Sequence, residues 1–177
     1  MNKEGQHKDN RKISLPKLLP NLFTTIGLCS GLTGIRFALD ENWHNAVFCI
    51  LVAACFDMID GLSARLLKAF SPFGAELDSL ADTISFGVSP AIITFLWIRE
   101  PILSTDQQYL LEWFWIPFLF YSVCNAFRLA RFNVMHSGES LETERKSYFT
   151  GVPAHAAAGL VLMPLGLDFI FNRFKVD

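Results

Sequence analysis

Five long apolar stretches constrain the fold of this chain more than any other feature of its sequence. A helix needs about 20 mostly apolar residues to cross the hydrocarbon core of a bilayer. Stretches that meet or approach this length run over residues 18–39, from about 46 toward 67, 77–97, 110–127 and 149–171. The sequence therefore predicts an all-α fold, a polytopic transmembrane helical bundle with five spans.

The composition agrees with a membrane protein and excludes other classes. Hydrophobic residues make up 51% of the 177 residues and charged residues only 18%, below the roughly 25% that is usual for soluble domains. Intrinsic disorder is excluded, because disorder needs few apolar residues and a high net charge. The net charge of −2 provides no basic footprint for nucleic acid, so we expect no nucleic-acid partner.

Lysine and arginine predict the orientation of the spans, because these residues are enriched in cytoplasmic connections. Residues 1–17 carry five of them, and the connections after the second and fourth stretches are basic as well. The connection after the first stretch has none, and the connection after the third has only Arg99. We therefore expect residues 1–17 to be a cytoplasmic segment of an integral membrane protein, in the inner membrane if the source is bacterial.

Four carboxylates stand where a membrane helix should have none. Ionisable groups in membrane helices are costly, so they are functional hypotheses by default. They lie toward the cytoplasmic ends of the second and third stretches, at Asp57, Asp60, Asp78 and Asp82. Helical spacing places each pair on one face of its helix. Gly61, Ala64 and Arg65 continue the first face, and Gly74 begins the second.

A helix break between the second and third stretches would bring the two acidic faces together. Proline disfavours the α region for the residue before it, so Ser71-Pro72 predicts a helix boundary. Ser71 suits the cap of the following helix, and Pro72 suits its first position. Two antiparallel helices joined by so short a link would bring their carboxylates face to face.

This arrangement predicts a metal-dependent phosphoryl-transfer site. Converging carboxylates in a low-dielectric site need cations to stay ionised, and hard divalent ions such as Mg²⁺ or Mn²⁺ prefer oxygen ligands. The small residues on both faces leave room for a ligand, and the planar guanidinium of Arg65 suits phosphate. In phosphoryl transfer, metal ions neutralise charge and a carboxylate takes a proton from the attacking hydroxyl. Two alternatives remain open: polar helix ends with Asp–Arg pairs, or a divalent-cation transporter.

The spacing of these residues resembles the signature of a known family. Asp57-x2-Asp60-Gly61-x2-Ala64-Arg65-x8-Gly74-x3-Asp78-x3-Asp82 is similar to that of the CDP-alcohol phosphatidyltransferases, with all eight positions at the family's spacing. The resemblance implies a helical membrane fold of about six spans, usually a homodimer, with the active site open to the cytoplasm. A chain of five spans would then be a shortened form, with one membrane domain over residues 18–172.

The same resemblance implies a role for each residue of the signature. Asp57, Asp60 and Asp78 would ligate divalent metal, Mg²⁺ or Mn²⁺, with Asp82 beside them. Asp82 would also be the general base. The remaining members would cradle the cytidine diphosphate group: Gly61, Ala64, Arg65 and Gly74.

Further segments resemble the phosphatidylserine synthase branch of the family. They read LPNLFTTIGLCSG at 19–31, LDSLADTISFGVSPA at 77–91, FRLARFNV at 127–134 and YFTGVPAHAAAG at 148–159. The branch implies transfer of the phosphatidyl group from CDP-diacylglycerol to L-serine, giving phosphatidylserine and CMP. A sibling enzyme that uses glycerol 3-phosphate or an inositol phosphate is the alternative.

Six further residues are candidates around this site. Asn21 and Thr24 could face the nucleotide, and Asn133 could bind the amino acid. Arg128 and Arg131 either anchor a helix end to headgroups or bind the serine carboxylate or a phosphate. His155 stands where the branch usually has proline, and we interpret it as an interfacial polar group. These candidates are all read from the chain.

Small residues in the first stretch predict close helix packing. Gly27 and Gly31 form a GxxxG pair, with Gly34 one turn further on. Such faces let two helices approach closely in a membrane.

Overall fold

The computed structural model describes residues 18–66, 71–103, 109–137 and 152–174, which are helical apart from short turns. The elements in chain order are α1 (Leu18–Leu39), α2 (Trp43–Leu66), α3 (Pro72–Asp82), the π-helix η2 (Thr83–Val88), α4 (Ser89–Leu103), α5 (Leu110–Ser137) and α6 (Ala154–Phe174). The expectation of an all-α bundle is confirmed for the described residues. The segment 1–17, for which we expected a cytoplasmic location, lies outside them.

Four helical segments of the described chain are long and apolar enough to cross a membrane: Asn21–Leu39, Trp43–Ser63, Pro72–Glu100 and Ala154–Phe171. The protein is therefore an integral membrane protein. Five spans were predicted and four are found among the described residues; the stretch predicted over 110–127, within α5, is not one of them. The third span also begins earlier than predicted, at Pro72.

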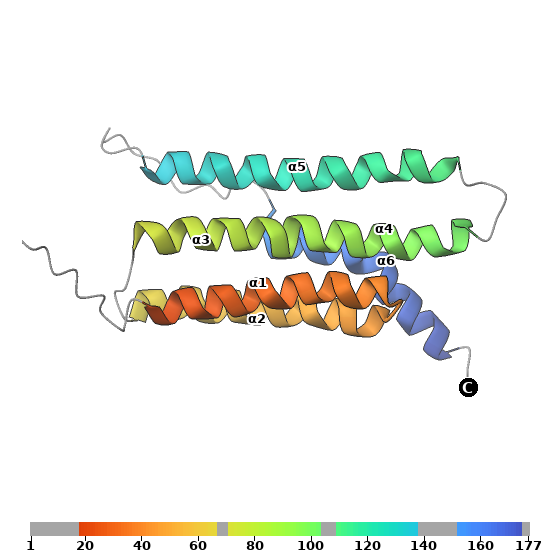
Figure 1. Ribbon diagram of the computed structural model, residues 1–177, viewed down its shortest axis with the longest axis horizontal. Coiled ribbons are helices and arrows are strands. Elements are labelled where there is room, and N and C mark those ends of the chain that lie inside the picture. Colours follow the sequence, from red (N-terminus) through yellow and green to blue (C-terminus); the bar gives the residue numbers. More distant parts are fainter. Residues whose placement is uncertain (1–17, 67–70, 104–108, 138–151, 175–177) are drawn as a thin grey trace, which may run out of the picture.

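The helices lie side by side in an elongated bundle (Figure 1). α1 packs along α2, and the unbroken run α3–η2–α4 lies beside this pair. α4 contacts α1, α5 and α6, so the third span is the centre of the bundle. Every element that contributes to the candidate site described below therefore contacts this central run.

A tight turn joins α1 to α2. Glu41 has a φ of 57°, a left-handed conformation that ends a helix and that few residues other than glycine adopt. The Glu41 N–H donates to the Ala38 carbonyl (3.1 Å) and the Asn42 N–H to the Phe37 carbonyl (2.8 Å). These bonds use carbonyls that the end of a helix leaves free, and they place α2 antiparallel to α1.

The glycines of α1 permit the close packing that the sequence predicts. A β-carbon added at Gly31 would lie 2.7 Å from Ser85 Oγ and 3.0 Å from Ser85 Cα. One added at Gly34 would lie 3.0 Å from the Ala46 carbonyl oxygen. α1 thus approaches η2 on one side and α2 on the other, with no room for larger side chains.

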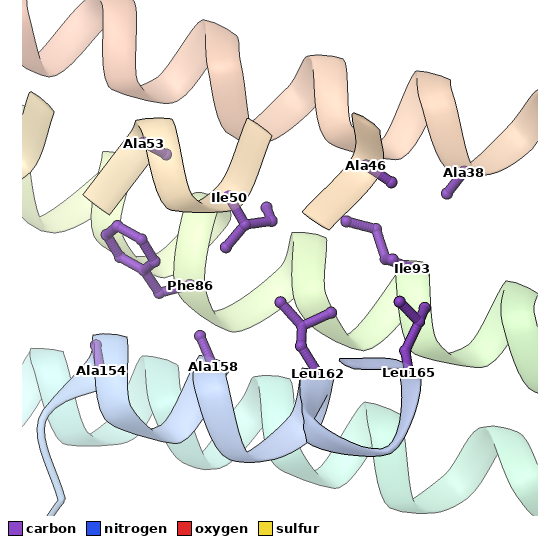
Figure 2. Packing of buried hydrophobic residues seen from close by; sticks show 10 residues of the cluster. All are labelled: Ala38, Ala46, Ile50, Ala53, Phe86, Ile93, Ala154, Ala158, Leu162 and Leu165. Atoms are coloured by element: carbon purple, nitrogen blue, oxygen red, sulfur yellow. The ribbon is translucent and has the colours of Figure 1, made fainter. Parts of the chain in front are cut away.

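Apolar side chains fill the interior, as Figure 2 shows. Ten buried residues form this core: Ala38, Ala46, Ile50, Ala53, Phe86, Ile93, Ala154, Ala158, Leu162 and Leu165. The alanines of α1, α2 and α6 pack with larger side chains from α2, η2, α4 and α6, so the layers interdigitate. The outer faces are apolar too, with exposed side chains such as Phe48, Leu51 and Phe120. This exposure fits a surface that meets lipid rather than water.

Candidate active site

The start of α3 positions two of the aspartates. Ser71 has an extended backbone (φ −134°, ψ 144°), and its Oγ accepts a hydrogen bond from the Gly74 N–H at 3.0 Å. Pro72 occupies the first turn of the helix, where it removes no needed donor. Both predictions about this helix start are confirmed. From here α3 carries Asp78 and Asp82 along one face.

The four carboxylates come together, as the facing-helix argument predicts. Asp57, Asp60 and Asp78 each offer an oxygen, and these atoms lie within 4.8 Å of one another. Asp57, Asp82 and His155 form a second group, whose ligand atoms also lie within 4.8 Å of one another. Asp57 belongs to both groups. The arrangement could hold divalent cations at two adjacent positions that share one carboxylate.

Asp60 is the most deeply placed of these groups. Its side chain is 5% exposed, and its Oδ2 accepts a hydrogen bond of 2.6 Å from the Thr24 hydroxyl, which is 6% exposed. Thr24 lies on α1, so this bond ties α1 to α2 at the site. The sequence analysis named Thr24 as a candidate for contact with the nucleotide, and the structure adds that its hydroxyl donates to Asp60.

Asp78 supplies the observation that favours a bound cation. Its Oδ1 is buried, and no hydrogen-bond partner for that atom is found within the described part of the chain. A buried charged oxygen without a partner costs more free energy than a neutral one, unless a cation compensates it. The oxygen-rich donor set is the one that Mg²⁺ and Mn²⁺ prefer, so the residues fit such an ion.

Directly after Asp82 the helix widens into the π-helix η2. The Ser89 N–H donates to the carbonyl of Ile84, five residues earlier, which is the π-helical pattern. Single π-turns within α-helices are found frequently at functional sites. Here the wider turn separates α3, with its two aspartates, from the apolar α4, and no periodicity in the sequence signals it.

Side chains of α5 bind the carbonyl groups of η2. The Tyr121 hydroxyl donates to the Phe86 carbonyl (2.7 Å), and the Asn125 amide reaches the same oxygen (3.4 Å). The Ser122 hydroxyl donates to the Gly87 carbonyl (3.0 Å). We did not select these three residues from the sequence. Polar groups at positions 121, 122 and 125 of an apolar helix were the available signal, because buried polar side chains need partners.

His155 is the site residue that the sequence interpretation missed. Its Nε2 lies 2.7 Å from Asp57 Oδ2, and its ring stands 4.2 Å from the ring of Phe86 at an interplanar angle of 45°. The interpretation of His155 as an interfacial polar group is therefore wrong. The residue lies in the first turn of α6, and only the packing of α6 against η2 brings it to the aspartates.

The residues predicted to bind the nucleotide lie on α1 and on the two helices that carry the aspartates. A β-carbon at Gly74 would lie 2.8 Å from Asn21 Oδ1, so Asn21 and Gly74 are neighbours. At Gly61 no atom lies within 4 Å of such a β-carbon, and the space beside it is open. Arg65 is exposed in the last turn of α2. The side chain of Ala64 lies outside the described residues.

The predicted acceptor-binding residues are not brought to the aspartates by any contact that the described residues show. The Arg128 guanidinium donates to the Val152 carbonyl, and so links α5 to the chain that leads into α6. Arg131 is exposed near the end of α5. The side chain of Asn133 lies outside the described residues.

A bundle of apolar helices that encloses a cluster of buried and partly buried carboxylates defines a class: integral membrane proteins with a site suited to divalent cations. The family model described as CDP-alcohol phosphatidyltransferase matches residues 17–174. The chain belongs to this family, as its signature residues implied.

Similar proteins are found in several bacteria, and they carry one name. A CDP-diacylglycerol–serine O-phosphatidyltransferase of Mycobacterium leprae (strain TN) is 38% identical over 93% of this chain and 52% of its own length. Proteins of the same name from Helicobacter pylori (strain J99 / ATCC 700824) and Bacillus subtilis (strain 168) are 34% and 31% identical over 85% of this chain, and over 58% and 76% of their own lengths. The chain spans about half the length of the first of these relatives. No solved structure matches the chain.

Proposed function

We propose that the protein transfers the phosphatidyl group of CDP-diacylglycerol to the hydroxyl of L-serine, which yields phosphatidylserine and CMP. The observation that carries this proposal is the convergence of Asp57, Asp60, Asp78 and Asp82, from two helices, on a single cluster. The names of the relatives support serine as the acceptor.

The four aspartates would hold Mg²⁺ or Mn²⁺ as the cofactor. Asp57, Asp60 and Asp78 form one ligand group, and Asp57 with Asp82 contributes to the second. When bound, such ions neutralise the charge of the pyrophosphate. The unpartnered Oδ1 of Asp78 supports this assignment.

Asp82 would be the general base. It lies in the cluster and is partly exposed at the junction of α3 and η2, so its carboxylate can accept the proton of the serine hydroxyl. The hydroxyl oxygen then forms a bond to the phosphorus of the phosphatidyl group, and the bond from that phosphorus to the CMP oxygen breaks. The electron pair leaves with CMP, and no covalent enzyme intermediate is needed.

The small residues around the cluster would bind the cytidine diphosphate group. We assign this role to Gly61, Ala64, Arg65 and Gly74, with Asn21 and Thr24 on α1. The open space at Gly61 and the close approach of Asn21 to Gly74 support it. For the serine carboxylate the candidates are Arg128, Arg131 and Asn133.

The orientation and the assembly of the protein are part of the proposal. The basic N-terminal segment and the basic connections favour an active site on the cytoplasmic side. We also propose a homodimer, which the family resemblance implies, and membrane lipid as the surroundings of the bundle.

Transport of divalent cations is the competing function from another class. A transport path needs polar groups that continue through the bundle. Beyond the carboxylates no buried residue of the described chain is ionisable: the apolar cluster there includes Ala38, Ala46, Ile93 and Leu165 (Figure 2), and the buried polar side chains are the neutral ones of Ser85, Ser89, Thr94 and Asn125. The described interior therefore favours an enzyme over a transporter, and vesicles that contain the protein should not take up labelled Mn²⁺.

One assay tests the proposed reaction and its alternatives. The protein is reconstituted into vesicles with CDP-diacylglycerol and receives serine, glycerol 3-phosphate or inositol phosphate, with and without Mg²⁺ or Mn²⁺. We expect CMP release only with serine and a divalent ion. Release with glycerol 3-phosphate alone would assign the protein to a sibling activity.

The role of Asp82 is tested with Asp82→Asn. Loss of a general base lowers turnover by about 10²- to 10⁴-fold, whereas binding of CDP-diacylglycerol should stay measurable. The matched control is Glu76→Gln, which makes the same kind of change at an exposed position of α3. CMP release by Asp82→Asn at the rate of this control would remove Asp82 as the base.

A further inference from the structure

We propose that His155 is a positioning residue for Asp57, whose carboxylate is shared by the two ligand groups of the site. The imidazole Nε2–H donates to Asp57 Oδ2 and holds this carboxylate in the orientation that both groups require. The inference rests on the proposed function, because it concerns the same metal site. It adds α6 to a site that the family signature places on α2 and α3 alone.

The geometry of the contact is that of a charge-assisted hydrogen bond. Nε2 and Oδ2 are 2.7 Å apart, and the side chains of His155 and Asp57 are 39% and 23% exposed. Bonds between an N–H and an ionised carboxylate are about 2.7–2.9 Å long and stronger than neutral ones. The contact is thus short enough and sheltered enough to restrain Asp57.

The imidazole packs against the apolar core, and the helix that carries it is anchored in that core. The ring of Phe86 packs against it at 4.2 Å, and Phe86 is 2% exposed within the core. Ala154, the neighbouring residue at the start of α6, is 3% exposed and belongs to the same core. A donor that is anchored in this way can fix the rotamer of its partner rather than follow it.

Asp57 is the carboxylate whose orientation matters most. It is a member of the group Asp57–Asp60–Asp78 and also of the group that contains Asp82 and His155; with His155 as the donor, Asp57 and Asp82 are the carboxylates left to bind a cation there. A carboxylate has two oxygens and about four lone-pair sites, so it can accept one hydrogen bond and still bind cations. Hydrogen-bond partners of ligating carboxylates orient them, and losing such a partner costs about 10- to 100-fold in metal affinity.

The chain contains a matched control for this contact. His44, at the start of α2, stacks on Phe169 near the end of α6 with ring centroids 3.9 Å apart. It also joins α2 to α6, but toward the other end of α2, away from the aspartates. Replacing His44 therefore removes a histidine between the same two helices without touching the site.

The experiment measures Mn²⁺ binding to the full chain in detergent, from the paramagnetic resonance signal of free Mn²⁺. The proteins compared are wild type, His155→Leu, His155→Gln and His44→Leu. We expect His155→Leu to bind Mn²⁺ about 10- to 100-fold more weakly. The Gln amide nitrogen can take the place of Nε2, so His155→Gln should recover most of the affinity, and His44→Leu should match wild type.

Three outcomes would overturn the proposal. Wild-type affinity in His155→Leu would show that Asp57 needs no restraint. A ¹⁴N coupling to bound Mn²⁺ that vanishes in His155→Leu would make His155 a direct ligand instead of a positioning residue. If His155→Leu does not fold, His155→Gln decides, and a loss of tenfold or more in that variant rejects the hydrogen-bond role.

A fourth outcome concerns the proposed function itself. If wild-type protein binds no Mn²⁺, the metal site is wrong, and the inference about His155 fails with it. If wild type binds Mn²⁺ and His155→Leu binds it equally well, the metal site stands and only the role of His155 is rejected.

Discussion

Gly31→Ala tests whether the close approach of α1 to η2 holds the site together. The added β-carbon would lie 2.7 Å from Ser85 Oγ, 2.9 Å from Ser85 Cβ and 3.0 Å from Ser85 Cα. The hydroxyl can rotate away, but the backbone Cα cannot, so one helix must move by a few tenths of an ångström. Ser85 is three residues from Asp82, and the shift would displace η2 relative to Thr24 on α1.

The size of the effect follows from two opposing contributions. Overpacking of a tight interface costs about 1–3 kcal/mol. Alanine is favoured over glycine within a helix by about 1 kcal/mol, which offsets part of this cost. Comparison with Gly159→Ala isolates the overpacking cost. That variant gains the same helix preference on α6, but no atom lies within 4 Å of its β-carbon.

Thermal unfolding in detergent compares the two variants. In a chain of this size 1 kcal/mol corresponds to about 2–4 °C, so Gly31→Ala should melt about 2–12 °C below Gly159→Ala. CMP release should fall in Gly31→Ala and remain at the wild-type rate in Gly159→Ala. Equal melting temperatures for the two variants would refute the packing argument.

Three further substitutions test separate parts of the site. Gly61→Leu should not lower stability, because the space there is open and leucine is favoured over glycine within a helix. It should nevertheless raise the KM for CDP-diacylglycerol, and an unchanged KM would remove Gly61 from the substrate site. Thr24→Val loses the hydrogen bond to buried Asp60 and should destabilise the metal-free protein by about 1.5–3 kcal/mol. The variant should therefore melt below wild type without metal, and Mn²⁺ should make this difference in melting temperature smaller, because a cation compensates the Asp60 carboxylate. The same difference with and without Mn²⁺ would count against Asp60 as a ligand. Tyr121→Phe loses its bond to the Phe86 carbonyl and should cost about 1 kcal/mol, which denaturant unfolding would show; a variant as stable as wild type would mean that η2 does not need this bond.

Much of the fold could be predicted because membrane helices and their breaks depend on local sequence. Leu18–Leu39 is a helix with the predicted bounds, since an apolar stretch of this length has few other ways to satisfy its backbone in lipid. Ser71 caps α3 as predicted, because capping involves only neighbouring residues. The approach of the two acidic helix faces could be predicted from helical spacing and from the helix boundary at Ser71-Pro72.

The features that were missed depend on contacts between distant segments. The bond between His155 and Asp57 spans 98 residues, and nothing local to residue 155 indicates it. The hydrogen bond from the Thr24 hydroxyl to Asp60 spans 36 residues, and it was not predicted either, because it depends on how α1 packs against α2. Likewise, α5 carries Tyr121 and Asn125 toward η2, which requires the bundle to be assembled.

The sequence by itself determined that this chain is a helical membrane protein with four aspartates on two helix faces. Hydrophobic length and 3.6-residue periodicity are properties of single segments, and they can be read before the chain is folded. Only the tertiary structure decided which groups surround those aspartates: the hydroxyl of Thr24, the imidazole of His155 and the π-helix that follows Asp82. Side chains from different helices meet according to how the helices pack, and that packing depends on the whole bundle at once.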